Sequence, residues 1–507
     1  MPEHHISVNL QHAVGQINPN IYGHFAEHLG ACIYEGIWVG EDSPIPNTNG
    51  MRNDVIAAMK KIAPPVIRWP GGCFADDYHW RDGIGPRDSR PDRINIWWGE
   101  DIENNHFGTH EFLQFCRLVG AEPYLVGNVG SGTPGELRDW VEYCNFAGDS
   151  TLSRERAANG SPEPFGVRYW GVGNENWGCG GSFDPEDYAA AYRQFSTYLR
   201  EFGQTPLYLI ACGPRNNDID WTLRFLEKLK PAWRPKIHGF AAHYYARARD
   251  PQGRESYSAF TGTATDYTDA QWYYQIYVGL EMERLVMQQR AAMDSYDPDR
   301  QIGLIVDEWG TWHPPTEGHH PRHLWQQNTI RDALVAATTL DIFNRHADKV
   351  VMGNIAQTIN VLQAMILTDG DQMLTTPTYH VYDMYQAHQG GQSILLQVDS
   401  DVIPFEINGK QYDLPALSGS ASLKGRTLTL SIVNSHIDQP IETTIDLGGI
   451  KIKQAELSTL VGEDIYSHNT FAAPSQVEPR LTSLDVPDGE WVHTFEPASV
   501  NVITFTL

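Results

Sequence analysis

The stretch YWGVGNENWG at residues 169–178 has a counterpart in IVDEWG at residues 305–310. In each, a short apolar run stops at a glutamate, Glu175 or Glu308, that lies beside tryptophan and glycine. Such a run is typical of a buried parallel strand whose carboxyl end brings a polar side chain to the mouth of an α/β barrel. The two stretches therefore predict a barrel with two carboxyl groups at one end.

The rest of residues 16–388 alternates in the same way between short apolar runs and amphipathic segments. The runs typical of strands are residues 20–25, 66–69, 124–129, 168–174, 207–212, 238–244, 303–307 and 350–356. The segments typical of helices are residues 54–62, 109–119, 135–146, 185–202, 221–229, 269–293, 324–344 and 379–388. Eight strand and helix pairs predict that residues 16–388 form a (β/α)8 TIM barrel, the catalytic domain.

The pattern changes near residue 390, where apolar and polar residues begin to alternate one by one. Residues 423–432, 441–447 and 500–507 alternate in this way, and turn signals such as Asn408-Gly409 lie between them. Residues 6–10 near the N-terminus have the same period of two. We therefore expect residues 1–15 and 389–507 to form one all-β sandwich, similar to a jelly roll, that takes in the N-terminal strand.

The composition excludes several classes of function. A formal net charge of −26 leaves no basic surface for nucleic acid or anionic lipid, so neither is expected as a partner. No apolar run approaches the roughly 20 residues that cross a bilayer, and the N-terminus carries no secretion signal. We expect a cytoplasmic protein that binds a neutral substrate.

All six cysteines lie before residue 213 and lack the Cys-x-x-Cys spacing of a zinc ribbon. Most are expected to be buried thiols of the core. Cys73 and Cys179 differ, because each lies in a glycine-rich loop after a predicted strand that ends at the barrel mouth. A disulfide between them is a hypothesis that a thiol count on the denatured protein would test.

Two carboxyl groups at one barrel mouth are typical of a glycosidase, in which one protonates the leaving oxygen and the other attacks or activates water. The alternative is that Glu175 and Glu308 only cap helices or pair with arginines. Glu27 and Arg68 also follow predicted strands. Arg68 can hold a carboxylate in its ionised form. The alternatives are a structural ion pair for Arg68 and a solvated loop charge for Glu27.

Six motifs together resemble glycoside hydrolase family 51, the intracellular α-L-arabinofuranosidases. They are GHFAEH (23–28), RWPGG (68–72), GNE (173–175), HYY (243–245), DEW (307–309) and NIAQ (354–357). The resemblance implies a retaining enzyme whose fourth barrel strand carries the acid/base and whose seventh carries the nucleophile. Counting the predicted strands independently puts Glu175 on the fourth and Glu308 on the seventh. A retaining mechanism requires carboxyl groups about 5 to 5.5 Å apart.

The resemblance also implies roles for further residues. Asn174 is expected to bind a sugar hydroxyl and Tyr245 to orient Glu308. The remaining implied substrate-binding residues are Glu27, Arg68, Cys73, Trp98, His243, Trp309 and Gln357, of which Trp98 and Trp309 are expected to stack on sugar faces. Many relatives carry asparagine where this chain has Cys73, so an amide contact is expected to be missing there.

Residues 313–323 contain four histidines, which could suggest a metal site. The expected chemistry needs no metal and no cofactor, so we predict that this segment is a mobile loop over the barrel mouth.

The resemblance implies a homo-oligomer, a hexamer, that acts on arabinofuranosyl oligosaccharides or polysaccharides. Two alternatives stay open from the residues alone. One is a related retaining barrel glycosidase acting on a β-xyloside or a glucan, and the other is a carbohydrate-binding protein without turnover.

Overall fold

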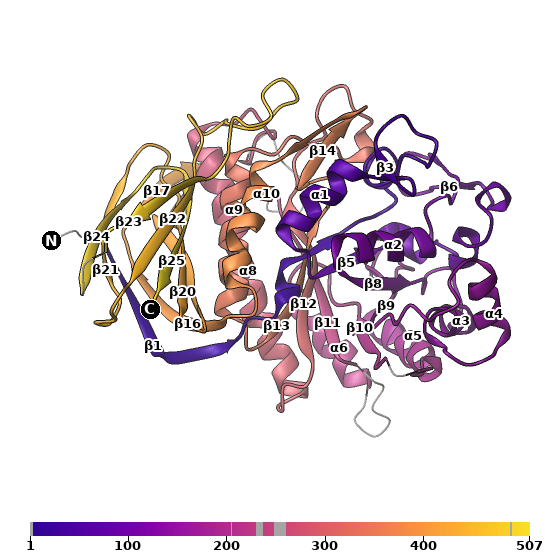
Figure 1. Ribbon diagram of the computed structural model, residues 1–507. Coiled ribbons are helices and arrows are strands. Elements are labelled where there is room, and N and C mark those ends of the chain that lie inside the picture. Colours follow the sequence, from indigo (N-terminus) through magenta and orange to yellow (C-terminus); the bar gives the residue numbers. More distant parts are fainter. Residues whose placement is uncertain (1–3, 204, 230–236, 248–259, 487–488) are drawn as a thin grey trace.

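The computed structural model describes residues 4–203, 205–229, 237–247, 260–486 and 489–507, and it consists of a barrel joined to a large, mostly antiparallel sheet (Figure 1). The barrel lies on the right of Figure 1 and the sheet on the left, and both chain termini lie at the sheet. No helix in the described ranges has the length and apolar character that crossing a membrane requires.

The barrel is closed and all of its strands pair in parallel, in the order β10-β11-β12-β13-β2-β5-β8-β9. Its strands are β2 (Gly23–Phe25), β5 (Val66–Trp69), β8 (Glu122–Gly127), β9 (Tyr169–Val172), β10 (Tyr208–Ala211), β11 (Gly239–Ala246), β12 (Gly303–Thr311) and β13 (Val350–Ala356). The predicted TIM barrel is confirmed, and β9 and β12 are its fourth and seventh strands in chain order.

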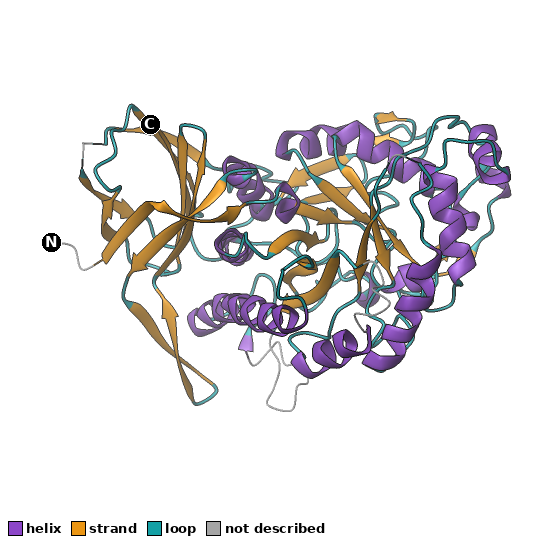
Figure 2. Ribbon diagram, turned by 90° about the horizontal axis from the view of Figure 1, so that it is seen from below, coloured by secondary structure: helices purple, strands orange, loops and turns teal. Residues whose placement is uncertain are grey.

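Helices surround the barrel strands (Figure 2). Their bounds are α1 (Asn53–Ile62), α2 (Thr109–Val119), α3 (Pro134–Asn145), α4 (Thr151–Ala158), α5 (Pro185–Tyr198), α6 (Ile219–Leu229), α8 (Asp269–Tyr296), α9 (Ile330–Arg345) and α10 (Pro377–Tyr385). The sequence did not predict α4, because it buries only three residues and lacks an apolar stripe. The predicted helix over 324–344 begins at Ile330 instead, where Thr329 and Asp332 form a capping box.

Nine strands form the second sheet, in the order β23-β22-β25-β20-β19-β16-β1-β21-β24. Their bounds are β1 (His4–Gln16), β16 (Gln392–Asp399), β19 (Leu417–Lys424), β20 (Thr427–Asn434), β21 (Ile441–Asp446), β22 (Gln454–Leu460), β23 (Arg480–Leu484), β24 (Glu490–Phe495) and β25 (Ser499–Thr506). Strand β1 pairs antiparallel with β16 and parallel with β21. The prediction that the N-terminal strand joins the C-terminal strands is therefore confirmed.

Short two-stranded hairpins decorate both parts. They are β3 (Asn47–Thr48) with β4 (Met51–Arg52), β6 (Arg93–Ile94) with β7 (Ile102–Glu103), β14 (Ile366–Asp369) with β15 (Gln372–Thr375), and β17 (Val402–Ile407) with β18 (Lys410–Pro415). The β6–β7 hairpin lies in the segment between β5 and α2, beside Trp97 and Trp98.

Helix α9 lies between the barrel and the nine-stranded sheet, and residues 330–344 are all buried. Its Asp341 accepts hydrogen bonds from Ser420 at 2.7 Å, from Ser431, and from Tyr385 at 3.1 Å. Burial raises the pKa of the Asp341 carboxyl to about 6, although these hydroxyls oppose the rise. The junction between the two parts is therefore held by a buried polar network as well as by apolar packing.

Candidate active site

The two glutamates of the sequence motifs meet at the carboxyl ends of β9 and β12. One carboxylate oxygen of Glu175 and one of Glu308 lie within 4.8 Å of each other. Glu175 is half-buried, whereas Glu308 is 5% exposed. This separation fits carboxyl groups that act on one bond without an intervening water, and it is shorter than the roughly 6.5 to 9.5 Å of inverting glycosidases.

Two cations lie among the carboxylates. Arg68, at the end of β5, donates from Nη1 to Glu308 Oε1 at 2.9 Å. His243, on β11, contacts Glu175 Oε1 through Nδ1 at 3.0 Å and Asp307 Oδ1 through Nε2 at 3.1 Å. Burial alone would lower the pKa of His243, but Glu308, Asp307 and Glu175 raise it to about 10. The imidazole is therefore protonated at neutral pH, and both ring nitrogens donate.

Three groups fix the Glu308 carboxylate. Tyr245 donates from its hydroxyl to Oε2 at 3.0 Å, Arg68 binds Oε1, and His243 Nδ1 lies 3.4 Å from Oε2. Burial raises the pKa of Glu308, while the positive charges of His243 and Arg68 oppose the rise. The carboxylate is held in one orientation by donors that favour its ionised form.

Asp307 is a site residue to which the sequence assigned no role. Its carboxylate accepts from Tyr124 at 2.8 Å and lies 3.4 Å from Arg68 Nε. Burial would raise the pKa of Asp307, but Arg68 and then His243 lower it below its ordinary value. Consecutive strand residues normally point to opposite faces, yet Asp307 and Glu308 both reach the same cations. The pairing of β12 with β13 is irregular between Val306 and Trp309, as in a bulge, which allows this arrangement.

Glu27 forms a second polar group across the mouth. Its Oε1 accepts from the Phe74 backbone N–H at 3.1 Å and from Trp98 Nε1 at 2.8 Å, and its Oε2 accepts from Gln357 Nε2 at 3.1 Å. Burial and the nearby Glu308 raise the pKa of Glu27 to about 8. A Cβ atom on Gly72 would lie 2.5 Å from Glu27 Oε2, so the glycine allows the close approach. Glu27, Trp98 and Gln357 are thus brought together.

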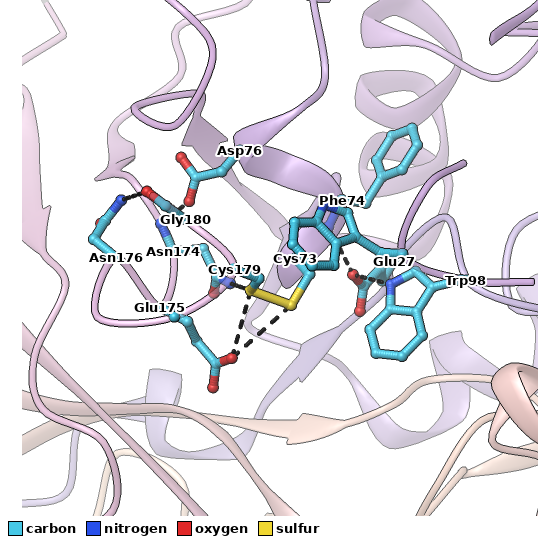
Figure 3. Close-up of a disulfide and its surroundings, with 12 residues drawn as sticks. Glu27, Cys73, Phe74, Asp76, Trp98, Asn174, Glu175, Asn176, Cys179 and Gly180 are labelled. Carbon is cyan, nitrogen blue, oxygen red and sulfur yellow. Dashed lines mark hydrogen bonds between the residues drawn. A yellow bond between two sulfur atoms is a disulfide. The ribbon is translucent and has the colours of Figure 1, made fainter. Parts of the chain in front are cut away.

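A disulfide joins Cys73 to Cys179, as hypothesised from their placement, and the other four cysteines are free and buried (Figure 3). Both sulfur atoms contact Glu175 Oε2. The distance is 3.7 Å from Cys179 Sγ and 4.0 Å from Cys73 Sγ.

Asn174 accepts from Arg68 Nη2 through its side chain, and its backbone N–H donates to Asp76 Oδ2 at 2.7 Å. The sequence assigned no role to Asp76, because nothing local marks a buried aspartate as a partner of a distant loop.

One predicted site residue lies elsewhere. Trp309 is 1% exposed and packs edge-on against Phe343 of α9, with ring centroids 5.6 Å apart. It points outward from the barrel while its neighbour Glu308 points inward, so the prediction that it stacks on sugar is wrong. Trp312, by contrast, is half-buried and packs edge-on against Tyr245 with centroids 4.9 Å apart.

The segment 313–323 was predicted to be a mobile loop, but its first residue, His313, is fixed in the core. His313 is buried and contacts Asp332 Oδ1 at 2.8 Å, because Asp332 caps α9 directly beneath it. His319 and His320 are exposed, and His323 contacts Asp101 at 2.7 Å. The four histidines are dispersed over a buried network and the surface.

Two sets of three potential metal ligands come within 4.8 Å of one another in the described part of the chain. One consists of Glu175, His243 and Glu308. The protonated His243 has no free lone pair for a metal. The other consists of Glu175, Cys73 and Cys179, whose sulfurs are bonded to each other. As arranged, the donors of both sets are already engaged with neighbouring side chains.

The chain was compared with known proteins. Residues 58–271 match the α-L-arabinofuranosidase 1 domain and residues 307–499 the α-L-arabinofuranosidase C-terminal domain. An intracellular exo-α-L-arabinofuranosidase of Bacteroides ovatus is 43% identical over 94% of this chain and 90% of its own length. The chain belongs to glycoside hydrolase family 51, the α-L-arabinofuranosidases.

Solved structures of α-L-arabinofuranosidases agree with this assignment over nearly the whole chain. The family 51 arabinofuranosidase of Xanthomonas axonopodis pv. citri aligns with a TM-score of 0.92 and 39% identity, covering 99% of this chain and 100% of the other. The arabinose complex of the Thermotoga maritima α-L-arabinofuranosidase aligns with a TM-score of 0.87 and 32% identity over 99% and 100%. Family 51 enzymes are glycoside hydrolases that retain the anomeric configuration.

Proposed function

We propose that Glu308 is the nucleophile and Glu175 the acid/base of an exo-acting, retaining α-L-arabinofuranosidase. The observation that carries the proposal is the approach of one oxygen of each carboxyl group to within 4.8 Å at the ends of β9 and β12. Glu308 lies beside Arg68, Tyr245 and His243, which suits an ionised nucleophile. Glu175 is the more exposed of the two, which suits a proton donor that faces a leaving group.

In the first step, Glu308 attacks the anomeric carbon while the glycosidic oxygen takes a proton from Glu175. His243 Nδ1 donates to Glu175 Oε1 at 3.0 Å, so the proton that Glu175 transfers is carried by its other oxygen, Oε2. The product is a covalent arabinosyl ester of Glu308, and the alcohol departs.

Esterification removes one negative charge from the cluster. The negative charge of Glu175 raises the pKa of Glu308, so the two carboxylates repel each other, and esterification of Glu308 ends that repulsion. In the second step the ionised Glu175 accepts a proton from water, which attacks the anomeric carbon and releases arabinose. The two steps use side chains alone and need no metal or cofactor.

We further propose the substrate contacts. Glu27, Gln357 and Asn174 are ligands for sugar hydroxyls, and Trp98 offers an apolar ring beside Glu27. The natural substrates are terminal non-reducing α-L-arabinofuranosyl groups of arabinan, arabinoxylan or their oligosaccharides. The similarity to the intracellular exo-α-L-arabinofuranosidase of Bacteroides ovatus supports an exo action and an intracellular enzyme, here in the cytoplasm. Assembly as a hexamer is carried by the family resemblance alone.

Removal of the nucleophile tests the proposal. Glu308→Ala should lower turnover of a nitrophenyl α-L-arabinofuranoside by about 10⁴-fold or more, and azide should partly restore it, giving an arabinosyl azide of inverted configuration. The surface variant Glu463→Ala serves as the matched control, because its side chain is exposed in the loop that follows β22 of the nine-stranded sheet. Unchanged turnover in Glu308→Ala would refute the nucleophile assignment.

The substrate assignment has its own test. The values of kcat/KM on nitrophenyl α-L-arabinofuranoside and β-D-xylopyranoside separate this activity from that of a β-xylosidase. We expect the arabinofuranoside to be preferred, and a preference for the xyloside by about tenfold, or 1.4 kcal/mol, would overturn the substrate assignment.

A further inference from the structure

A short 3-10 helix, η2 (Cys73–Asp76), is bonded at two points to the loop that carries Glu175. Asp76 accepts the Asn174 backbone N–H at 2.7 Å, one residue before Glu175. Cys73 is bonded to Cys179, four residues after Glu175. Figure 3 shows the Glu175 side chain extending beside the sulfur bridge. The same segment therefore fixes the loop on both sides of the proposed acid/base.

The backbone of Glu175 needs such support. Its φ is +41°, in the left-handed region that side-chain-bearing residues rarely adopt. A conformation of this kind costs on the order of 1 to 3 kcal/mol and persists only where the surroundings impose it. Asp76 is itself fixed, because it also accepts from the backbone N–H groups of Val129 at 2.6 Å and Gly130 at 2.9 Å.

The disulfide also determines what surrounds the carboxyl group. Oε1 of Glu175 contacts His243, whereas Oε2 faces the two sulfur atoms. In the described residues no N–H or O–H group donates to Oε2. A disulfide has no proton to donate, so Oε2 stays available to the leaving group. Two thiols in its place would be free to donate to Oε2 and to move apart.

The disulfide is also more accessible to a reductant in solution than the other cysteines are. Cys73 and Cys179 are half-buried, whereas Cys32, Cys116, Cys144 and Cys212 are buried. Disulfides in reducing compartments are typically catalytic or redox-sensing rather than structural.

We propose that Cys73 and Cys179 are positioning residues for Glu175, and that their disulfide is a reducible site at which a dithiol lowers the acid/base function without unfolding the enzyme. The inference rests on the proposed role of Glu175. One thiolate of the dithiol attacks a sulfur and displaces the other protein thiolate, and the second thiol then closes the reductant into a cyclic disulfide. Two electrons pass to the protein, and both cysteines end as thiols.

The experiment uses the full-length enzyme, oxidised or treated with dithiothreitol under native conditions. Thiols are counted by mass after alkylation, and four before treatment and six after it are expected. The values of kcat/KM are then measured on phenyl and on 2,4-dinitrophenyl α-L-arabinofuranosides. Phenol leaves poorly without a proton and dinitrophenol leaves well without one. We expect reduction to lower kcat/KM about tenfold or more on the phenyl glycoside but less than about twofold on the dinitrophenyl glycoside.

Variants complete the design. The double variant Cys73→Ser/Cys179→Ser should match the reduced enzyme and ignore dithiothreitol. Cys116→Ala, which changes a distant buried cysteine on α2, should keep the response. A thiol count that stays at four, or six thiols with unchanged kinetics, refutes the proposal. Equal losses on both glycosides, accompanied by a lower Tm, also refute it, since they indicate a structural role only.

Glu175→Ala on the same two glycosides separates the two proposals. A selective loss on the phenyl glycoside in this variant, without one on reduction, sinks only the inference about the disulfide. If Glu175→Ala itself shows no selective loss, the proposed acid/base is wrong.

Discussion

The hydrogen bond from Tyr245 to Glu308 Oε2 gives a quantitative test of how the nucleophile is kept ionised. Tyr245→Phe removes one donor at 3.0 Å and leaves the ring, which still packs against Trp312. A hydrogen bond to a charged group contributes about 1.5 to 3 kcal/mol. Since the hydroxyl favours the ionised carboxylate, its loss raises the pKa of Glu308, and at 1.36 kcal/mol per pH unit the rise is about 1 to 2 pH units.

The assay is the pH dependence of kcat/KM on 2,4-dinitrophenyl α-L-arabinofuranoside, whose leaving group needs little protonation. The acid limb reports ionisation of the nucleophile in the free enzyme, so it should move to higher pH by about 1 to 2 units. Tyr198→Phe, at an exposed position on α5, is the matched control and should leave the limb in place. An acid limb in Tyr245→Phe that coincides with that of the control would show that Tyr245 does not set the ionisation of Glu308.

Three further outcomes follow from the positions of individual side chains. Trp309→Ala should destabilise the fold by about 3 to 5 kcal/mol and leave KM unchanged, because the ring is core; a raised KM at unchanged Tm would restore it as a sugar platform. Trp98→Ala should raise KM by about tenfold with little change in Tm, since it removes a half-exposed donor to Glu27; equal KM values in variant and parent would exclude it from the substrate site. Asp341 binds a proton more tightly in the folded protein than in the unfolded chain, so its contribution to stability falls as pH rises from about 4 through 6. The Asp341→Asn side chain cannot ionise, so its free energy of unfolding relative to that of the parent should rise by about 3 kcal/mol between pH 4 and 7. A difference in unfolding free energy that is independent of pH would contradict this.

Most barrel elements are predictable from the sequence because local periodicity encodes them. The strands at Val66–Trp69 and Val350–Ala356 and the helix at Thr109–Val119 have the bounds that the apolar pattern predicts. The pattern misplaced the start of α9, where a capping box outweighs the apolar residues before it. It missed α4, which has little apolar surface to bury.

For the site, the sequence indicated which residues lie at the strand ends but not where their side chains point. Glu175 and Glu308 were found because each ends an apolar run. The sequence did not show that Asp307 belongs to the site, nor that the Trp309 side chain points away from it. A strand irregularity turns Asp307 toward the cations, and the alternation of strand side chains sends Trp309 to the helix layer.

The chain by itself thus determined the alternation of strands and helices, the acidic net charge that disfavours nucleic acid as a partner, and the two strand-end carboxyl groups. Only the closed barrel decided that these groups approach to within 4.8 Å, that His243 lies between Glu175 and Asp307, and that Cys73 meets Cys179 over 106 residues of sequence. The physical reason is that periodicity is a property of neighbouring residues, whereas distances across the mouth depend on how eight strands close and on where one of them bulges.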